Sequence, residues 1–550
     1  METFDHLRKG KLDWICTGAI FVLLMLRSCV VGARYWPQLD DYIQYVGYYS
    51  WGSFFELQKD VGLLASRPLA GLADYFVWAP LFDHMILGVA LVSAMYALSI
   101  LLMKKLMDRY FSLGPVFCVV MGLLPLGVEG TYWMSASTRI VAGLLFACLA
   151  ALAFGRWLDS GRWGWAVAFA VLILFPFGFY EQTAVLAMTL VLGMAILEIR
   201  NWKQGVLSLL VFPAAVIYFK ITGLFALDNV YSNRAELVLP VSDYYWDTFL
   251  PDILSQIKTV FVDGTFYTLA KGFVRAVQLI YSGEWLLWAI VLLFCCGLFG
   301  VLIYRNRGEA AENNVWLALL VGALLAAAPV SIFLFLANPW FSFRGAVMSF
   351  AGIALIADVL VNALWRKLPF NWNGPAIVAV TAAFVFCAAG AVDVSDYRDT
   401  YQNDQKVAAL VLEKVSVEEG RVGILGIEKS YLPNQNFFWH EHIHGCTESA
   451  WAFSGLMGSL VEARERPSVT PLPTDPIYRK WNQAVNRPES FESLYYYDHA
   501  AGELIPVYLE KMEAAGEHDY RVIDQNGVEI GRVWEEQDGI GYFRTSLKKD

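Results

Sequence analysis

The chain alternates between long apolar stretches and shorter polar ones. Each apolar stretch has roughly 17–22 residues, the length that a helix needs to cross the hydrocarbon core of a bilayer. The pattern predicts eleven transmembrane helices and therefore a polytopic α-helical membrane protein. These helices are expected at 14–31, 84–103, 115–134, 139–158, 163–179, 181–199, 204–223, 285–304, 315–337, 345–364 and 375–392.

Lysine and arginine cluster beside the ends of these stretches. With eleven spans every cluster falls on one side of the membrane, which the positive-inside rule makes the cytoplasmic side. The N-terminus is then predicted inside, and the residues after 392 outside. The clusters are Arg8-Lys9-Lys11, Lys104-Lys105-Arg109, Arg156-Arg162, Arg200-Lys203, Arg305-Arg307 and Arg366-Lys367.

Nearly all the polar sequence falls on the predicted outer side. We expect a membrane domain over 1–392 and an extracytoplasmic α/β domain over 393–550. The second domain should contain helices at 404–415 and 450–461, a strand at 421–427, and a hairpin at Asn526-Gly527, a dipeptide that suits a type I′ turn. The membrane domain has outer loops at 32–83, 126–138, 224–284 and 337–344, and the amphipathic segments 42–49 and 74–78 of the first loop suit the membrane interface.

Composition supports a membrane protein and removes several other classes. Hydrophobic residues make up 57% and charged residues 17% of the 550, against about 45–50% and about 25% in soluble chains. The net charge of −10 argues against a nucleic-acid partner. No GxxxxGK[ST] motif is present, which argues against a P-loop pump. Seven of the eight cysteines lie in apolar stretches, so Cys446 has no disulfide partner in the polar tail.

The acidic pair Asp40-Asp41 directly follows the first span. Adjacent carboxylates at a membrane boundary are costly unless they are paired or used. A carboxylate in such a place is a candidate general base for a hydroxyl nucleophile. The alternative interpretation is a solvated N-cap of a helix that starts at Tyr42, because Asp is a favoured capping residue.

Two further carboxylates interrupt apolar sequence on the outer side. Glu181 lies in FPFGFYEQT (175–183), a Pro/Gly break between two spans, where a carboxylate faces water or protein rather than lipid. The alternative is a capping or packing role at a tight turn. Glu129 in LGVEGTYW (126–133) has a similar setting.

Three arginines lie at the outer ends of spans and are candidates to bind phosphate. Guanidinium groups grip phosphate oxygens with two parallel hydrogen bonds. The alternative is that each side chain snorkels to lipid headgroups, and Arg27, inside the first span, has the same alternative. The three candidates are Arg344, Arg139 and Arg67.

Alternating histidines mark the stretch WHEHIHGC (439–446). On a strand they would share one face and could hold Zn²⁺ together with Cys446 or Glu441. The alternative is a tail segment that packs near the site on the membrane domain. The histidines are His440, His442 and His444.

Taken together, the acidic pair after the first span, the amphipathic first outer loop, some eleven spans and the outer α/β tail resemble the GT-C fold glycosyltransferases. These enzymes take sugar from a polyprenyl-phosphate donor. Four short stretches resemble more narrowly the bacterial glucosyltransferases that decorate O-antigens and related surface glycans. They are DDYI (40–43), SRPLAGL (66–72), FGFYEQ (177–182) and DYRDTYQNDQ (396–405).

The resemblance implies a hexosyltransferase, with glucose as the expected sugar, in a bacterial plasma membrane. It would transfer the sugar to a surface glycan or a lipid-linked acceptor on the outer face. Asp40 or Asp41 would be the general base, and direct displacement implies inversion at the anomeric carbon. The arginines would bind the donor phosphate, Glu181 would orient sugar or acceptor, and Glu129, Tyr132 and Tyr180 are candidate substrate contacts.

Cofactor use and two other function classes stay open at this point. Some GT-C enzymes need a divalent cation such as Mg²⁺ or Mn²⁺ and others need none. A transporter or flippase of a lipid-linked saccharide would normally show similar halves or matching broken helices, and the sequence has one Gly/Pro break, at 175–178. A non-catalytic scaffold with the tail as binding module should tolerate Asn at Asp40 and Asp41.

Overall fold

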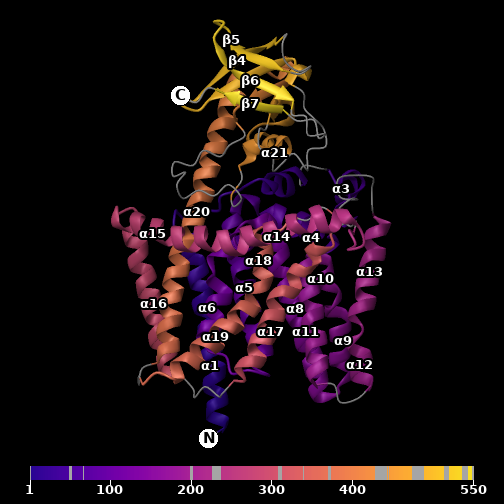
Figure 1. Cartoon of the computed structure of the whole chain (residues 1–550), viewed down its shortest axis with the longest axis vertical. Coiled ribbons are helices and arrows are strands. Elements are labelled where there is room, and N and C mark those ends of the chain that lie inside the picture. Colours follow the sequence, from indigo (N-terminus) through magenta and orange to yellow (C-terminus); the bar gives the residue numbers. More distant parts are fainter. Residues whose placement is uncertain are drawn as a thin grey trace. The chain divides into compact units, whose positions relative to one another are not determined.

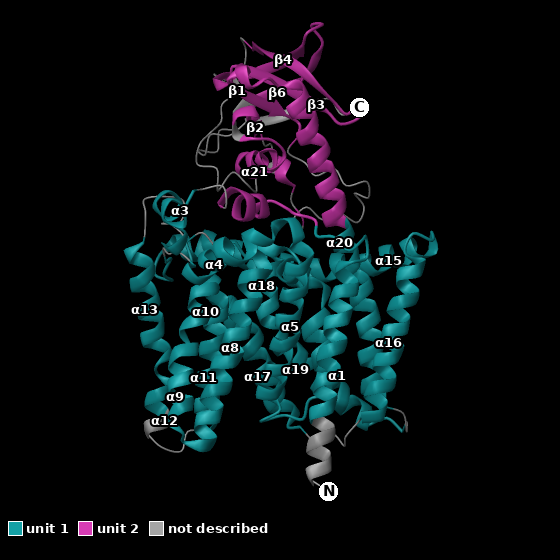
Figure 2. Cartoon of the chain, turned by 180° about the vertical axis from the view of Figure 1, so that it is seen from behind, with its two compact units in different colours: residues 1–35, 51–395 teal, residues 36–50, 396–550 magenta. Residues whose placement is uncertain are grey.

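Helices dominate the computed structural model, and one sheet forms near the C-terminus (Figure 1). The chain divides into two compact units, which are described separately (Figure 2). Unit 1 comprises Met1–Tyr35 and Trp51–Ser395, and unit 2 comprises Trp36–Ser50 and Asp396–Asp550. The structure describes residues 2–48, 52–65, 67–198, 202–225, 237–306, 313–337, 340–369, 373–427, 443, 445–472, 488–512, 519–535 and 543–547.

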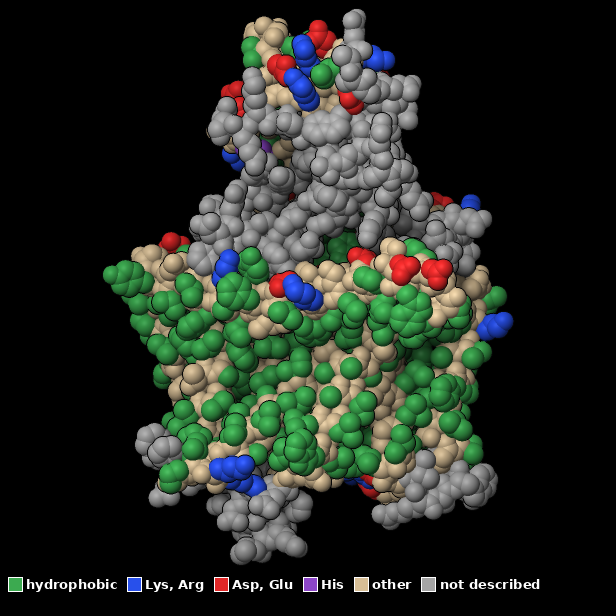
Figure 3. Space-filling model, viewed as in Figure 1, with side chains coloured by type: hydrophobic (Ala, Val, Ile, Leu, Met, Phe, Trp, Pro, Cys, Tyr) green, Lys and Arg blue, Asp and Glu red, His purple; other side chains and the backbone are tan. Residues whose placement is uncertain are grey.

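Among the described residues, eight helical stretches are long and apolar enough to cross a membrane. Hydrophobic side chains, green in Figure 3, spread over the visible face of the region that these helices form. The chain is therefore a helical membrane protein, as the sequence predicts. The eight stretches are Pro68–Met107, Met134–Ser160, Glu181–Glu198, Gly205–Leu224, Leu286–Asn306, Val315–Leu334, Phe343–Arg366 and Gly374–Lys414.

The other three predicted spans are not among these eight stretches, so the count of eleven stays a prediction. The first falls in α1 (Glu2–Ser28). The fifth is divided into α9 (Trp163–Leu172) and α10 (Leu174–Phe179). The third is broken into α6 (Pro115–Leu123) and α7 (Val128–Thr131). Leu124 precedes Pro125 and has a ψ of 121°, the extended conformation that a residue before proline prefers.

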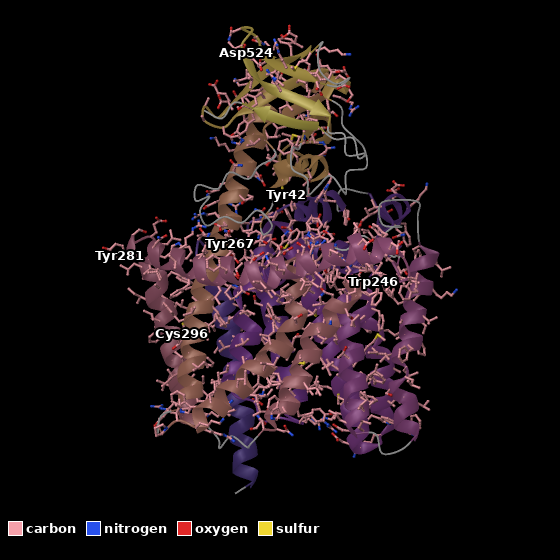
Figure 4. All side chains as sticks on the ribbon, viewed as in Figure 1. Tyr42, Trp246, Tyr267, Tyr281, Cys296 and Asp524 are labelled. Carbon is pink, nitrogen blue, oxygen red and sulfur yellow. The ribbon has the colours of Figure 1, made fainter. Side chains whose placement is uncertain are left out.

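A long helical run crosses the ends of the upright helices in unit 1, with α14 and α15 as its labelled parts (Figure 1). It combines η7 (Tyr245–Phe249), α14 (Leu250–Lys258), η8 (Thr259–Asp263), η9 (Thr265–Lys271) and α15 (Gly272–Tyr281), where the three η segments are π-helical. Figure 4 labels Trp246 and Tyr281 near its two ends.

Buried residues recur at nearly every fourth position along this run. An α-helix has 3.6 residues per turn, so a period of four would rotate the buried face by about 40° each turn. The π segments, with their i→i+5 hydrogen bonds, widen the turn and hold that face against the bundle. The buried positions are Tyr245, Phe249, Ile253, Val260, Gly264, Thr268, Gly272, Arg275 and Ala276.

Ion pairs tie together the helix ends where α5 (Met85–Met107), α8 (Met134–Ser160) and α11 (Glu181–Glu198) finish. Arg109 donates to Asp159 at 2.8 and 2.5 Å and also to Glu198. These hydrogen bonds raise the pKa of the Arg109 guanidinium above its ordinary value. The network therefore joins three helices at one end of unit 1.

Unit 2 contains a seven-stranded sheet in the order β2-β1-β3-β4-β5-β6-β7. The strands β2, β1 and β3 are parallel, and each later pair is antiparallel. Leu425, Val507 and Val522 belong to its core. The strands are β1 (Arg421–Leu425), β2 (Ser468–Leu472), β3 (Ser493–Asp498), β4 (Glu503–Lys511), β5 (Tyr520–Asp524), β6 (Glu529–Glu535) and β7 (Phe543–Leu547).

The helices predicted for the tail are present. The end of α20 (Gly374–Lys414) covers the first, and α21 (Ala450–Leu460) is the second. The predicted hairpin between β5 and β6 is present, but its turn is not of type I′. The Asp524 N–H donates to the Val528 carbonyl, which closes a loop of three residues, and in that loop only Gly527 has a positive φ. A type I′ turn needs a positive φ at both central residues. The Asp524 carboxylate accepts the backbone N–H groups of Val528 and Asn526, which lowers its pKa.

The division of the chain departs from the predicted boundary at 392/393, because residues 36–50 belong to unit 2. Within that segment the π-helical turn η1 (Tyr42–Gly47) packs against α21. The aromatic rings of Tyr42, Tyr45 and Tyr48 are almost fully buried. These three aromatic side chains therefore face protein, and the interfacial location of 42–49 stays a prediction.

Candidate active site

The acidic pair lies in a strained turn of unit 2. Leu39, immediately before it, has a φ of +39°, the single positive φ among the described residues other than glycine. A β-carbon makes that region unfavourable, so such residues persist only where the surroundings hold them, often at functional sites. The backbone N–H of Gln38 donates to Oδ2 of Asp41 at 2.8 Å, which closes the turn.

The two carboxylates have different surroundings. Asp41 is fully buried and, although it occupies the N-cap position of η1, its side chain makes no capping hydrogen bond. The interpretation of Asp41 as a solvated helix cap is therefore wrong, since its carboxylate turns back to Gln38. Asp40 is partly exposed. Asp41 thus holds the turn, and Asp40 is the more exposed member of the pair.

All three predicted arginines lie at one end of unit 1, opposite the Arg109 network, and each is paired with a carboxylate. Arg67 binds Glu181 with both arms of its guanidinium, Nε at 3.0 and 3.2 Å and Nη2 at 2.9 Å. It also lies over the Tyr180 ring, 4.4 Å from the centroid. Glu181, the first residue of α11, and Tyr180 therefore meet Arg67, which precedes α4 (Pro68–Ala73).

The pKa of Arg67 reflects this neighbourhood. Burial lowers it, but the Glu181 carboxylate and Tyr180 outweigh the burial, so the pKa is raised overall. Arg139 opposes the rise, which shows that the two cations lie within electrostatic range of each other. A small apolar cluster that includes Ala70, Ala142 and Phe179 fixes the helices that carry these side chains.

Arg139 of α8 pairs with Asp74, at 2.6 Å between Nη2 and Oδ2. Asp74 begins η3 (Asp74–Trp78) and is fully buried. Sequence reasoning missed it, because 74–78 was interpreted as an interfacial segment; the available signal was a lone carboxylate in an otherwise apolar stretch. Snorkelling to headgroups does not describe Arg67 or Arg139, whose guanidinium groups are bonded to carboxylates.

Arg344 of α18 (Phe343–Ala346) is held differently. Its backbone N–H donates to Glu129 Oε2 at 3.0 Å, while its guanidinium Nε lies 3.8 Å from Oε1 of the same residue. No acceptor within the described residues lies within hydrogen-bond distance of the guanidinium. The group lies 5.5 and 5.7 Å from the ring centroids of Trp133 and Trp340, and the Arg344 side chain is 23% exposed.

Glu129 and Tyr132 support this arrangement from the side of α7. The Glu129 carboxylate also accepts from Ser342 Oγ at 3.1 Å, so it fixes the turn before α18. Gly130 lets the two short helices approach, because a β-carbon there would lie 3.1 Å from Arg344 Cα. Tyr132 is fully buried, with its ring 5.4 Å from that of Tyr35.

Arg27 is not a snorkelling residue. It is 1% exposed, and its Nη2 donates to Thr131 Oγ1 at 3.0 Å. The guanidinium therefore points into unit 1 and holds the end of α7, directly after the Glu129-Gly130 dipeptide. An intramembrane cation of this kind is expected to have a specific partner.

The predicted metal site cannot be placed on the structure. His440, His442, His444 and Glu441 lie outside the described residues. Cys446 is buried, and its backbone N–H donates to Asp404 Oδ2 at 2.7 Å. Over the ranges that the structure describes, no group of three or more His, Cys, Asp or Glu is arranged to hold a metal ion.

No protein-family model matches the sequence, and no curated protein matches it.

Proposed function

We propose that the protein is a membrane glycosyltransferase that moves a hexose from a polyprenyl-phosphate donor to a glycan or lipid-linked acceptor. The observation that carries the proposal is the Arg344 guanidinium, which lies near two indole rings and 3.8 Å from Glu129 Oε1, with no acceptor among the described residues within hydrogen-bond distance. Such a group suits a phosphate, which accepts parallel hydrogen bonds from a guanidinium. The indole faces offer apolar surface to a prenyl chain or a sugar ring.

The chemistry follows from the charges. The Asp40 carboxylate takes the proton of an acceptor hydroxyl as that oxygen attacks the anomeric carbon. The bond between the anomeric carbon and the phosphate oxygen breaks, and polyprenyl phosphate leaves with the electron pair. Arg344 stabilises the charge that develops on the phosphate, and Arg67 and Arg139, each paired with a carboxylate, have donors that a bound phosphate could share.

Several finer assignments belong to the same proposal. Asp40 is the base because it is partly exposed, whereas buried Asp41 holds the turn. A single displacement gives inversion at the anomeric carbon. The resemblance to bacterial O-antigen glucosyltransferases favours glucose as the sugar and the outer face of a bacterial plasma membrane, with the N-terminus in the cytoplasm.

The test uses purified protein in nanodiscs with a panel of polyprenyl-phosphate hexoses and candidate acceptors, with and without Mg²⁺ or Mn²⁺. Release of polyprenyl phosphate is followed by mass spectrometry for wild type and Asp40→Asn. We expect the variant to lose about 10²–10⁴-fold in rate, the usual contribution of a general base. Asp60→Asn, an exposed carboxylate in the same predicted loop, is the matched control and should retain full activity.

The outcomes separate the function classes. Retained activity in Asp40→Asn would discard the acidic pair as the base. A product that keeps the anomeric configuration of the donor would overturn the single displacement.

Transport of a lipid-linked saccharide is the second candidate. The breaks between α6 and α7 and between α9 and α10 favour it, because broken helices build transporter sites. No release with any donor, together with movement of labelled donor across the vesicle membrane, would establish transport. If the protein shows neither release of polyprenyl phosphate nor transport of the donor, a non-catalytic scaffold role would remain.

A further inference from the structure

The segment that carries the acidic pair is tied to the end of α20, far away in the sequence. Gln38 Nε2 donates to the Tyr397 carbonyl at 2.9 Å, and the rings of Trp36 and Tyr401 lie 5.4 Å apart. One turn further along α20, another side chain of the helix reaches the same segment. There Gln405 Nε2 donates to the Tyr42 hydroxyl at 3.2 Å.

Helix α21 packs against η1, and the residues just before α21 contact the end of α20. A β-carbon at Gly455 of α21 would lie 3.0 Å from Ile43 Cδ1 and 3.2 Å from Tyr42 Cβ, so a branched side chain at this position would push α21 and η1 apart. Asp404, on the same stretch of α20 as Gln405, accepts the backbone N–H of Cys446 just before α21. The end of α20, α21 and η1 therefore form one packed group.

Tyr42, Asp404 and Cys446 are almost fully buried in this group. Burial raises the pKa of Tyr42 and of Cys446 well above their ordinary values, with Asp404 adding to both rises. The strained Leu39 lies within the same segment, and strain of this kind persists only where the surroundings hold it. The contacts from α20 and α21 are the surroundings that hold it.

We propose that the end of α20 and α21 act as a positioning device for the acidic pair, with Gly455 and Gln405 as positioning residues. The C-terminal part of unit 2 then serves the reaction itself. This inference rests on the proposed function for its catalytic consequence. The physical part, that α21 holds residues 36–48 in place, stands on the contacts alone.

The experiment compares Gly455→Val with Gly458→Val in full-length protein in nanodiscs. Both glycines lie in α21, but a β-carbon at Gly458 meets only the end of the flexible Arg466 side chain, at 2.8 Å. Backbone hydrogen exchange over 36–48 is measured by mass spectrometry. We expect about tenfold faster exchange in Gly455→Val and no change in Gly458→Val, because exchange reports local opening. Peptides that contain Arg67 and Arg344 should exchange as in wild type.

Labelling of Cys446 with a membrane-impermeant maleimide gives a second measure, since its thiol is buried in wild type. Transfer activity gives the third: kcat should fall about 10²-fold, the effect of a displacement near 1 Å, with KM for the donor little changed. Tyr42→Phe, which removes only the hydroxyl that Gln405 contacts, is the milder variant should Gly455→Val fail to fold.

Unchanged exchange over 36–48 in both Gly455→Val and Tyr42→Phe would overturn the positioning role. Faster exchange with undiminished kcat would overturn its catalytic consequence. A wild type without transfer activity would refute the proposed function, and hydrogen exchange would still decide whether α21 holds the segment.

Discussion

The two ends of unit 1 both carry arginines beside carboxylates, yet they leave different groups available. At one end the Arg109 guanidinium donates from all three of its nitrogens to Asp159 and Glu198. At the other end the Arg344 guanidinium is 3.8 Å from its carboxylate and has no described acceptor. An ion pair is therefore not by itself a sign of function; unused donors are the more informative observation.

The contrast has a physical cause in the partners. Asp159 lies near the end of α8 and Glu198 is the last residue of α11, so both carboxylates reach the Arg109 guanidinium. The carboxylate oxygens of Glu129 instead accept hydrogen bonds from the Ser342 hydroxyl and the Arg344 backbone N–H. The carboxylate orients the turn before α18, and the Arg344 guanidinium lies 3.8 Å from it, near two indole rings and partly exposed.

Of the substitutions at the two ends of unit 1, Arg344→Ala should have the largest effect on kcat. Loss of a donor that stabilises developing charge typically lowers kcat by about 10²–10³-fold. The melting temperature should change little, because the guanidinium makes no hydrogen bond within the described residues. The measurement is polyprenyl phosphate release beside a thermal unfolding curve. A lower melting temperature with an unchanged kcat in Arg344→Ala would contradict this prediction, because Arg344 would then stabilise the fold and not the reaction.

Arg109→Ala should show the opposite behaviour. It removes hydrogen bonds to charged groups, which contribute about 1.5–3 kcal/mol each when well formed, and partial solvent screening at this surface reduces the sum. We expect a lower melting temperature with kcat per folded molecule unchanged. Arg109→Lys, which keeps the charge but not the planar fork, should recover only part of the stability. A tenfold loss of kcat in folded Arg109→Ala would contradict the comparison.

The smallest effect concerns Cys446, where a shifted pKa marks burial rather than chemistry. Its folded pKa lies well above the ordinary value of 9.0. The unfolded state therefore loses its proton first, and this contribution to stability is present below about pH 9 and is lost as pH rises further. Maleimide labelling of Cys446 should stay slow between pH 7 and 9 and accelerate above that range. Fast labelling at pH 7 would show that the thiol is exposed.

Sequence reasoning found the parts of the site that local pattern encodes. Arg67, Arg139 and Arg344 each follow or open an apolar stretch, and Glu181 follows a Pro/Gly break, so each was visible as a polar residue in an apolar setting. The two helices of the tail and its strands β1, β5 and β6 were visible from local pattern, whereas β2, β3, β4 and β7 were not predicted. Whether the acidic pair, the arginines and the tail act together in catalysis stays a prediction.

The remainder depends on pairing that no local pattern reveals. Asp74 is defined by its contact with Arg139, which is distant in the sequence. The membership of residues 36–50 in unit 2 depends on Tyr397, Gln405 and α21, which lie near the other end of the chain. The hairpin dipeptide was recognised, but the loop length depends on the Asp524 carboxylate, which adds side-chain hydrogen bonds to the turn.

The split of unit 2 between the two ends of the chain has a consequence for biosynthesis. About 350 residues separate its two parts, and a ribosome that adds 5–20 residues per second needs roughly 20–70 s to reach the second part. During that interval the Asp40-Asp41 turn has been made but lacks the elements that hold it. A nascent chain therefore carries Arg67 and Arg139 before α21 and the end of α20, the elements that hold the acidic turn, have been synthesised.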